Sequence, residues 1–136
     1  VQSALGSCDH LDVYGTDYET PDGTCIRDYI HVWDLVGAHA LLLEKMRQTP
    51  DNYTMNCGYG KGFSVREVVE TVKKVSGIDF RVNEVGRREG DPAAVIAGAE
   101  KIRDVLDWRP RHDDLGDIVS SAFDWEKYLQ TRNRKE

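Results

Sequence analysis

A tight turn that runs directly into an unusually polar strand is the feature that most limits how this chain can fold. Residues 21–23, Pro-Asp-Gly, favour a turn, and the segment after them has the apolar character of a strand. Arginine, aspartate, tyrosine and histidine interrupt that segment within positions 27–31. Because side chains alternate along a strand, Arg27 and Tyr29 would point to the same face. A planar guanidinium beside a phenol suits a phosphorylated ligand with a flat or ribose-bearing part.

The length and composition indicate one globular domain. The chain has 136 residues, of which 40% are hydrophobic and 31% charged, and this suffices for one core and argues against disorder. The net charge of -6 argues against nucleic acid or an anionic membrane as a partner. The three cysteines lack paired spacing, and the sequence shows no apolar run or leader, so we expect a cytoplasmic protein with reduced thiols.

Strand and helix patterns alternate along the chain, which predicts a mixed α/β fold. The predicted strands are residues 11–14, 27–31, 53–57 and 80–85, the last of them polar enough for a sheet edge. The predicted helices are 34–47, a segment from Ser64 to Gly77, 99–106, and one from Asp113 or Asp114 to about residue 130. Residues 1–5 resemble the tail of a further helix, and 131–136 form a charged, frayed end.

Local signals define where two of these helices begin and end. Asp34 is the expected N-cap of the first helix. Ser64 and Glu67 have the spacing of a capping box, and Gly77 is suited to stop the helix that the box begins. The three tryptophans, Trp33, Trp108 and Trp125, fit amphipathic packing better than a stacking platform.

Two arginine-bearing segments form the candidate binding site. Arg27 and Arg88 are distant in sequence, and together they could offer forked donors to a diphosphate, while Asp91 accepts from ribose hydroxyls. The alternative is that Arg87 and Arg88 are solvated charges paired with Glu89 and Asp91. The residues alone leave both interpretations open.

Other reactive residue types receive structural interpretations. The glycines at 58, 60 and 62 follow a predicted strand, but they miss the G-x-G-x-x-G spacing of a dinucleotide loop. His31 is expected to hold a structural hydrogen bond, and Asp28 to bond locally or to pair with an arginine. Cys25 is expected to be a buried, inert thiol. The histidines show no metal-ligand spacing, so we expect no metal site.

Two segments together resemble a known family. TPDGTCIRDYIHVWDL at 20–35 and RREGD at 87–91 resemble the signatures of UDP-glucose 4-epimerases, which are extended short-chain dehydrogenase/reductases. The resemblance covers essentially all of residues 1–136 as the C-terminal portion of such an enzyme. It implies a Rossmann-type fragment: the UDP-sugar-binding portion together with the last strand and helices of the nucleotide-binding sheet. The N-terminal NAD-binding domain would lie outside this chain.

The resemblance also implies roles for particular residues. Arg27 and Tyr29 match phosphate-side and nucleotide-side contacts, Arg88 matches a diphosphate contact, and Asp91 matches a residue that holds the uridine ribose. Val95 falls where some epimerases carry a bulky tyrosine beside the hexose. A valine there would leave room for an N-acetyl group, so we predict that the parent enzyme accepts UDP-N-acetylhexosamines as well as UDP-glucose and UDP-galactose.

The family's chemistry depends on parts that are absent from this sequence. Resemblance implies an isomerase of galactose and nucleotide-sugar metabolism, in which NAD oxidises the sugar to a 4-keto intermediate and a Tyr-x-x-x-Lys pair supplies the base. No such pair and no G-x-x-G-x-x-G motif occur here. We therefore predict that the chain alone has no catalytic residues, holds no NAD and is inactive. Its expected partners are a UDP-sugar, the NAD-binding half and further copies in a homo-oligomer.

Three alternatives remain. The chain could be the same portion of another nucleotide-sugar enzyme, such as a dehydratase or a decarboxylase. It could be a stand-alone nucleotide-sugar-binding module without catalysis. It could also be a truncated remnant whose exposed apolar faces drive self-association.

Overall fold

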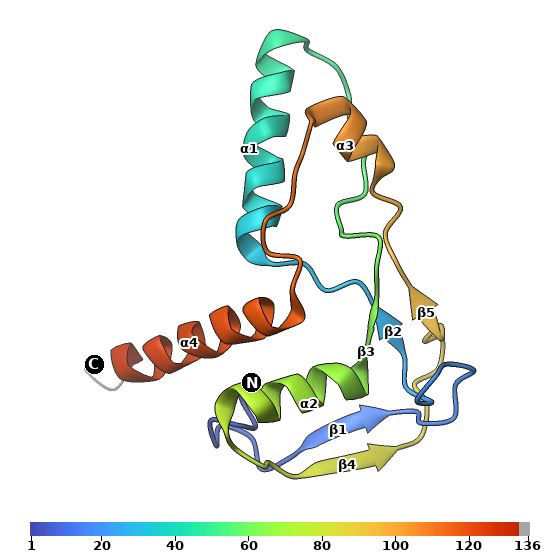
Figure 1. Cartoon of the computed structure of the whole chain (residues 1–136), viewed down its shortest axis with the longest axis vertical. Helices are drawn as coiled ribbons and strands as arrows, with labels where there is room; N and C mark the ends of the chain where they lie inside the picture. Colours follow the sequence, from blue (N-terminus) through green and yellow to red (C-terminus); the bar gives the residue numbers. More distant parts are fainter. Residues whose placement is uncertain (134–136) are drawn as a thin grey trace.

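The computed structural model describes residues 1–133 and shows a mixed α/β architecture, as the sequence patterns predicted (Figure 1). In chain order, the elements are β1 (Leu11–Tyr14), β2 (Ile26–Arg27), α1 (Val32–Gln48), β3 (Phe63–Ser64), α2 (Val65–Ser76), β4 (Val82–Val85), β5 (Ala94–Val95), α3 (Glu100–Leu106) and α4 (Leu115–Asn133). Among residues 1–133, no helix combines the length and the apolarity that crossing a membrane requires.

The strands form two small sheets. β1 and β4 pair in parallel, with Leu11 opposite Val82. β2 lies between β3 and β5, antiparallel to the first and parallel to the second. In the β2–β5 pair, Arg27 lies opposite Val95, which brings together two of the predicted site residues.

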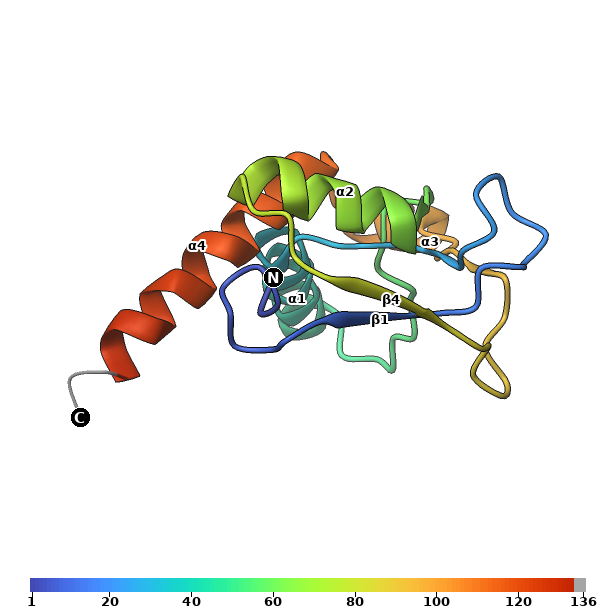
Figure 2. The same cartoon turned by 90° about the horizontal axis from the view of Figure 1, so that it is seen from below.

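A first hydrophobic core fills the space between the β1–β4 sheet, α2 and α4. α2 covers the sheet, and α4 packs on α2 (Figure 2). We call this cluster the sheet-side core; its buried members are Ala4, Val13, Val69, Val72, Phe80, Leu115, Val119 and Phe123. Burying a large apolar side chain of this kind contributes about 1.5–3 kcal/mol relative to exposure, so this cluster is a main source of stability.

A second hydrophobic core lies at the other end of the molecule, where α3 packs on α1 (Figure 1). We call it the arm-side core; its buried members are Ala38, Tyr59, Ala99, Ile102 and Trp108. The indole of Trp108 is only 2% exposed, and its N–H donates to the backbone oxygen of Asp34 at 3.1 Å. A buried indole needs such a partner, so this bond fixes the segment after α3 against α1.

The local signals of the sequence are confirmed at α2 and at the turn before β2. The hydroxyl of Ser64 accepts from the Glu67 N–H at 3.0 Å, and the Glu67 carboxylate accepts from the Ser64 N–H at 2.7 Å. Gly77 ends the helix at a φ of 69°, in the left-handed region that glycine tolerates best. Gly23 has a φ of 81°, and a Cβ there would collide with the carbonyl oxygen of Thr16.

Two predicted strands are wrong. Only Ile26–Arg27 of the polar segment is a strand, because Asp28 turns its carboxylate onto a neighbouring loop and the chain then enters α1. Residues 53–57 belong to no strand, since a ladder needs a hydrogen-bonding partner and none of residues 1–133 supplies one.

Three helix boundaries also differ from the prediction. The N-cap of α1 is His31, whose Nδ1 accepts from the Trp33 N–H at 3.1 Å, and Asp34 lies within the first turn. Residues 1–5 form a turn, in which the Leu5 N–H donates to the Val1 oxygen at 3.1 Å. α4 continues to residue 133, and residues 134–136 of the predicted frayed tail lie outside the described residues.

Candidate functional site

The candidate site is centred on β2 and β5, where three predicted residues meet. The Arg27 guanidinium lies 3.5 Å from the Asp91 carboxylate and also donates to the Ile26 oxygen at 2.8 Å. Val95 faces the strand of Arg27 and is 51% exposed. A cation, a carboxylate and an accessible small side chain therefore share one wall.

Arg88 reaches this wall through its backbone, while its side chain turns to another strand. The Asp91 N–H donates to the Arg88 oxygen at 3.3 Å, which holds the loop between β4 and β5. The Arg88 guanidinium lies 3.9 Å from the centre of the Tyr14 ring, at the end of β1. Cation–π contact of this kind stabilises an exposed pair by about 0.5–1 kcal/mol. The binding of one diphosphate by Arg27 and Arg88 together stays a prediction.

Arg87 has a different partner from either residue that the solvated-charge alternative named. It forms an ion pair with Asp17 at 2.8 Å, and its guanidinium lies 4.2 Å from the centre of the Tyr18 ring. The hydrogen bond between these two side chains lowers the pKa of Asp17 and raises the pKa of Arg87. Arg87 therefore fastens the loop after β1 to the loop after β4, and Arg88 stays free of carboxylate pairing within the described residues.

Tyr29 lies just beyond the end of β2 and is half-buried. Burial raises the pKa of its phenol, and the charge of Arg27 partly offsets that effect. The phenol is therefore neutral at physiological pH and can donate a hydrogen bond. Its assignment as a nucleotide contact stays a prediction.

The sequence reasoning missed the partner of Asp28. Its carboxylate accepts from the N–H groups of Tyr59 at 3.1 Å, Gly60 at 3.1 Å and Ala97 at 3.3 Å. It pairs with no arginine in the described part of the chain. The glycine loop thus uses two of its N–H groups on a carboxylate of its own chain, which leaves them unavailable to a cofactor phosphate. Alternation along the predicted strand 27–31 would have placed Asp28 opposite Arg27, but only Ile26–Arg27 of that segment is a strand.

A second missed residue is Asp34, which is 6% exposed and joins distant segments. Its carboxylate accepts from the Tyr59 hydroxyl at 2.7 Å and from the Arg111 and His112 N–H groups at 2.9 Å each. Burial by itself would raise the pKa of Asp34, but these hydrogen bonds outweigh it and lower the pKa below 3.8. Asp34 is therefore an ionised structural centre of the arm-side core.

His31 has the structural role that the sequence suggested. It is buried, caps α1 through Nδ1, and its ring stacks on His112 with 4.5 Å between centroids. Because Nδ1 accepts a hydrogen bond, the cap requires that this nitrogen carry no proton.

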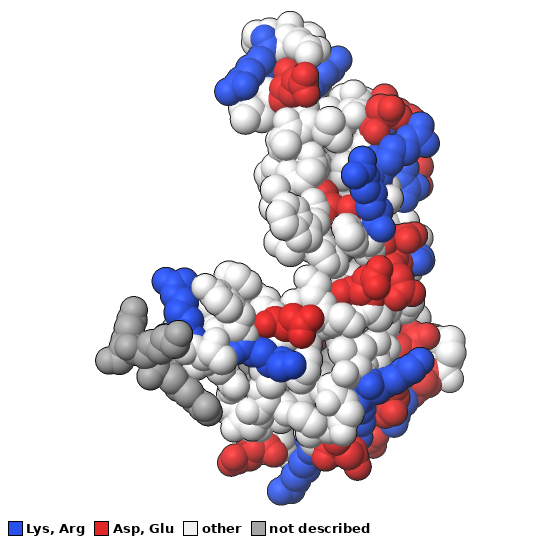
Figure 3. Space-filling view, turned by 60° about the vertical axis from the view of Figure 1, so that its left-hand side comes forward, with Lys and Arg blue, Asp and Glu red and all other residues white. Residues whose placement is uncertain are grey.

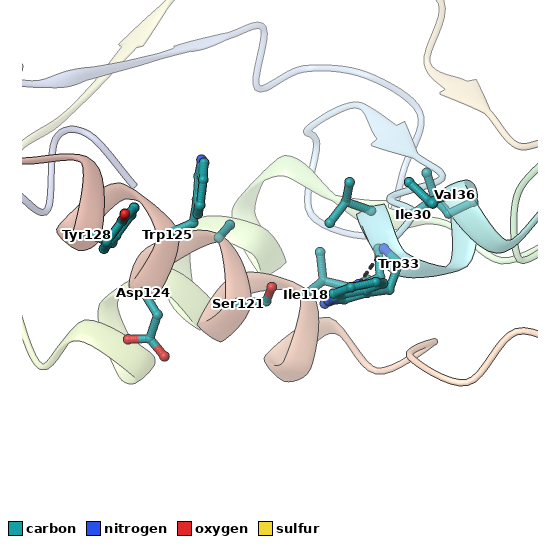
Figure 4. Close-up of a pocket in the computed structure, with 11 residues that line it drawn as sticks. Ile30, Trp33, Val36, Ile118, Ser121, Asp124, Trp125 and Tyr128 are labelled. Carbon is teal, nitrogen blue, oxygen red and sulfur yellow. Dashed lines mark hydrogen bonds between the residues drawn. The ribbon is translucent and has the colours of Figure 1, made fainter. Parts of the chain in front are cut away.

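An apolar groove lies apart from this wall, between the start of α1 and α4 (Figure 4). It has a volume of about 1070 Å³ and is lined mainly by Ile30, Trp33, Val36, Ile118, Trp125 and Tyr128. Figure 3 shows largely uncharged atoms around the hollow between α1 and α4. Of the three tryptophans predicted to fit amphipathic packing, Trp108 is buried, whereas Trp33 and Trp125 are 68% and 57% exposed.

Comparison with known proteins first shows the class that this chain resembles. The sequence model of the NAD dependent epimerase/dehydratase family matches residues 5–58. The fold agrees with this class: the structure has a TM-score of 0.90 and 37% identity to UDP-glucose-4-epimerase from Stenotrophomonas maltophila with bound NAD and formylated UDP-arabinopyranose, covering 96% of this chain and 39% of that one.

The particular relatives are UDP-glucose 4-epimerases. This chain is 53% identical over 129 residues to the UDP-glucose 4-epimerase of Azospirillum brasilense, covering 95% of this chain and 37% of the relative. The UDP-Glc/GlcNAc 4-epimerase from Campylobacter jejuni shows 50% identity and a TM-score of 0.85, over 93% of this chain and 38% of that one. The chain is similar to the C-terminal portion of these UDP-glucose 4-epimerases and spans little more than a third of their length.

Proposed function

We propose that this chain forms the UDP-sugar-binding wall of a UDP-glucose 4-epimerase, which interconverts UDP-glucose and UDP-galactose in galactose metabolism. The observation that carries the proposal is the 3.5 Å pairing of Arg27 with Asp91, which joins the two motifs of the family on adjacent segments. The relatives and their complexes with UDP-sugars support it. We further propose a cytoplasmic location, because Cys8, Cys25 and Cys57 are free and thiols stay reduced in the cytosol.

The residues of the wall have distinct tasks in this proposal. Arg27 and Arg88 offer forked donors to the diphosphate, which compensates its charge and fixes its position. Asp91 exchanges its contact with Arg27 for the ribose hydroxyls, and Tyr29 donates its phenol hydrogen to the nucleotide side. Exchange is feasible because Arg27 and Asp91 are both partly exposed, so their mutual pairing is weak.

NAD does not fit the residues of this chain. Two N–H groups of the glycine loop donate to Asp28, and the Tyr-x-x-x-Lys pair is missing from the sequence. We therefore assign NAD and the catalytic base to the remaining part of the enzyme, and we expect the chain alone to be inactive.

We propose that the groove between α1 and α4 is the docking surface for that NAD-binding part. Its aromatic side chains are exposed although the groove is apolar, which is typical of an unpaired interface. The chain spans 37% of the length of the Azospirillum brasilense relative, so the rest of such an enzyme is long enough to cover it.

Calorimetry and reconstitution test the proposed function together. Wild type should bind UDP, and Arg27→Ala should lose most of that affinity, while Arg109→Ala, an exposed cation whose only ion pair in the described chain is with Asp107, should not. Adding the NAD-binding half of a relative should produce 4-epimerase activity. UDP binding without activity would favour the stand-alone module. A dehydrated or decarboxylated sugar product would favour those enzymes, and concentration-dependent oligomers without UDP binding would favour the remnant.

We also propose that the reconstituted enzyme accepts UDP-N-acetylhexosamines, because Val95 is small and accessible opposite Arg27. The similarity to a UDP-Glc/GlcNAc 4-epimerase supports this. Val95→Tyr should lower kcat/KM for UDP-GlcNAc by about tenfold or more while leaving UDP-glucose turnover nearly unchanged.

Ile96→Tyr provides the control for that substitution. It adds the same phenol at the next position, just beyond β5, where the side chain is 46% exposed and lies beside Gly62. Equal losses in both variants, or a wild type that rejects UDP-GlcNAc, would contradict the role of Val95.

A further inference from the structure

One carboxylate ties the candidate wall to the glycine loop. Asp28 accepts from Tyr59 and Gly60 of the glycine loop and from Ala97, which follows β5. Three N–H donors around an ionised acceptor form charge-assisted hydrogen bonds, which are stronger than bonds between neutral groups. This contact therefore joins segments that are distant in the sequence.

The position of Asp28 makes this tie relevant to the site. Its neighbours in sequence are Arg27, at the end of β2, and Tyr29, which are both predicted ligand contacts. Its partner Ala97 lies two residues beyond Val95, which pairs with Arg27. Asp28 therefore connects the end of β2 to the segment that follows β5.

The glycine loop has the close packing that this arrangement requires. A Cβ at Gly58 would lie 2.5 Å from the Asp28 carboxylate and 2.7 Å from the Ala97 Cβ. These separations are too short for non-bonded atoms, so any larger residue at position 58 must displace the carboxylate, the Ala97 segment or both.

We infer that Asp28 is a positioning residue of the UDP-sugar site, whose carboxylate sets the spacing between Arg27 and Val95. This inference rests on the proposed function. In sequence, the glycine loop resembles a phosphate-binding loop. In the structure, its N–H groups donate to the carboxylate of Asp28 instead, so the loop supports the ligand wall. The inference predicts that Asp28 affects ligand affinity without touching the ligand.

Two substitutions at different positions test the inference. Asp28→Asn keeps the shape but replaces one acceptor oxygen with a donor that faces N–H groups. Gly58→Ala keeps the aspartate at position 28, but the added methyl group must displace its carboxylate, the Ala97 segment or both. Gly37→Ala is the matched control, because a Cβ there meets nothing within 4 Å.

The measurements are amide hydrogen exchange by NMR on the full chain and UDP affinity by calorimetry. Both variants should accelerate exchange about tenfold or more at Ala97 and at Ile26, whose N–H donates to Ala93 between β2 and β5, with amides of α2 unchanged. UDP affinity should also fall about tenfold in both variants, because a displaced Arg27 loses the geometry of its charge-assisted hydrogen bonds to the diphosphate. Gly37→Ala should change neither.

Two results would overturn the inference. In the first, exchange accelerates only at Tyr59 and Gly60, which would mean that Asp28 supports the loop and not the wall. In the second, the wall loosens while UDP affinity stays at the wild-type value. A wild type that fails to bind UDP would instead count against the proposed function, and the exchange rates would still decide whether Asp28 fixes the wall.

Discussion

At the scale of single residues, the buried carboxylate of Asp34 has the largest structural consequences. It accepts from a side chain and two backbone groups that come from well beyond α1. It also lies in the first turn of α1, where the helix dipole favours a negative charge. These partners come from segments far from Asp34 in the sequence. The local sequence pattern therefore predicted only an N-cap at this position.

Replacing Asp34 with asparagine should destabilise the chain in a pH-dependent way. The folded state lowers the pKa of Asp34 below 3.8, so the ionised group stabilises the fold above that pH and the contribution is lost as the pH falls through the lower folded pKa. We expect Asp34→Asn to lower the free energy of unfolding by about 2 kcal/mol near neutral pH, and the difference should shrink below about pH 4.

Urea denaturation at several pH values measures this difference. Asp104→Asn, at an exposed position of α3, is the control and should change stability little at any pH. A loss for Asp34→Asn that stays constant down to pH 2 would show that the charge is not its source.

At the scale of elements, the sequence predicted what is local and missed what needs a distant partner. The capping box at Ser64 and the stop at Gly77 depend on residues a few positions apart, and both are confirmed. The predicted strand at 53–57 depends on pairing with another segment, and it is not a strand here. Within the candidate site, the two motifs together predicted that their segments share one site, and Arg27 does lie beside Asp91, whereas the partners of Asp28 were visible only in three dimensions.

The two glycines Gly77 and Gly37 should respond to alanine in opposite ways. Gly77 has a φ of 69°, which costs alanine about 1 kcal/mol, so Gly77→Ala should be destabilising by that amount. Gly37 lies inside α1 with open space around it, so Gly37→Ala should stabilise by about 0.5–1 kcal/mol. Thermal unfolding followed by circular dichroism checks both, and a stabilised Gly77→Ala would contradict the left-handed cap.

At the scale of the whole molecule, two separate cores leave an apolar groove between α1 and α4. The sheet-side core and the arm-side core share none of their buried members. Trp33 lies on α1, which packs in the arm-side core, and Trp125 lies on α4, which packs in the sheet-side core. The groove therefore joins the regions of the two cores (Figure 4). A partner bound there would contact both parts at once.

Tryptophan quenching should report whether the proposed NAD-binding half covers the groove. Acrylamide should quench Trp33 and Trp125 readily in the chain alone, whereas Trp108, at 2% exposure, should be protected. Adding the NAD-binding half should protect the two exposed tryptophans as well. Single Trp→Phe variants separate the signals, and unchanged quenching of Trp33 in an active reconstituted enzyme would place the docking surface elsewhere.

The sheet-side core also determines when the chain can fold during synthesis. Its members include Ala4 near the start of the chain and Phe123 near the end, and Gln130 of α4 donates to the Leu5 oxygen at 3.4 Å. Contacts between such distant positions form late, because the loop between them must first close. The ribosome must therefore release α4 before this core closes, and until then the apolar faces of β1 and α2 stay exposed in a partly folded nascent chain.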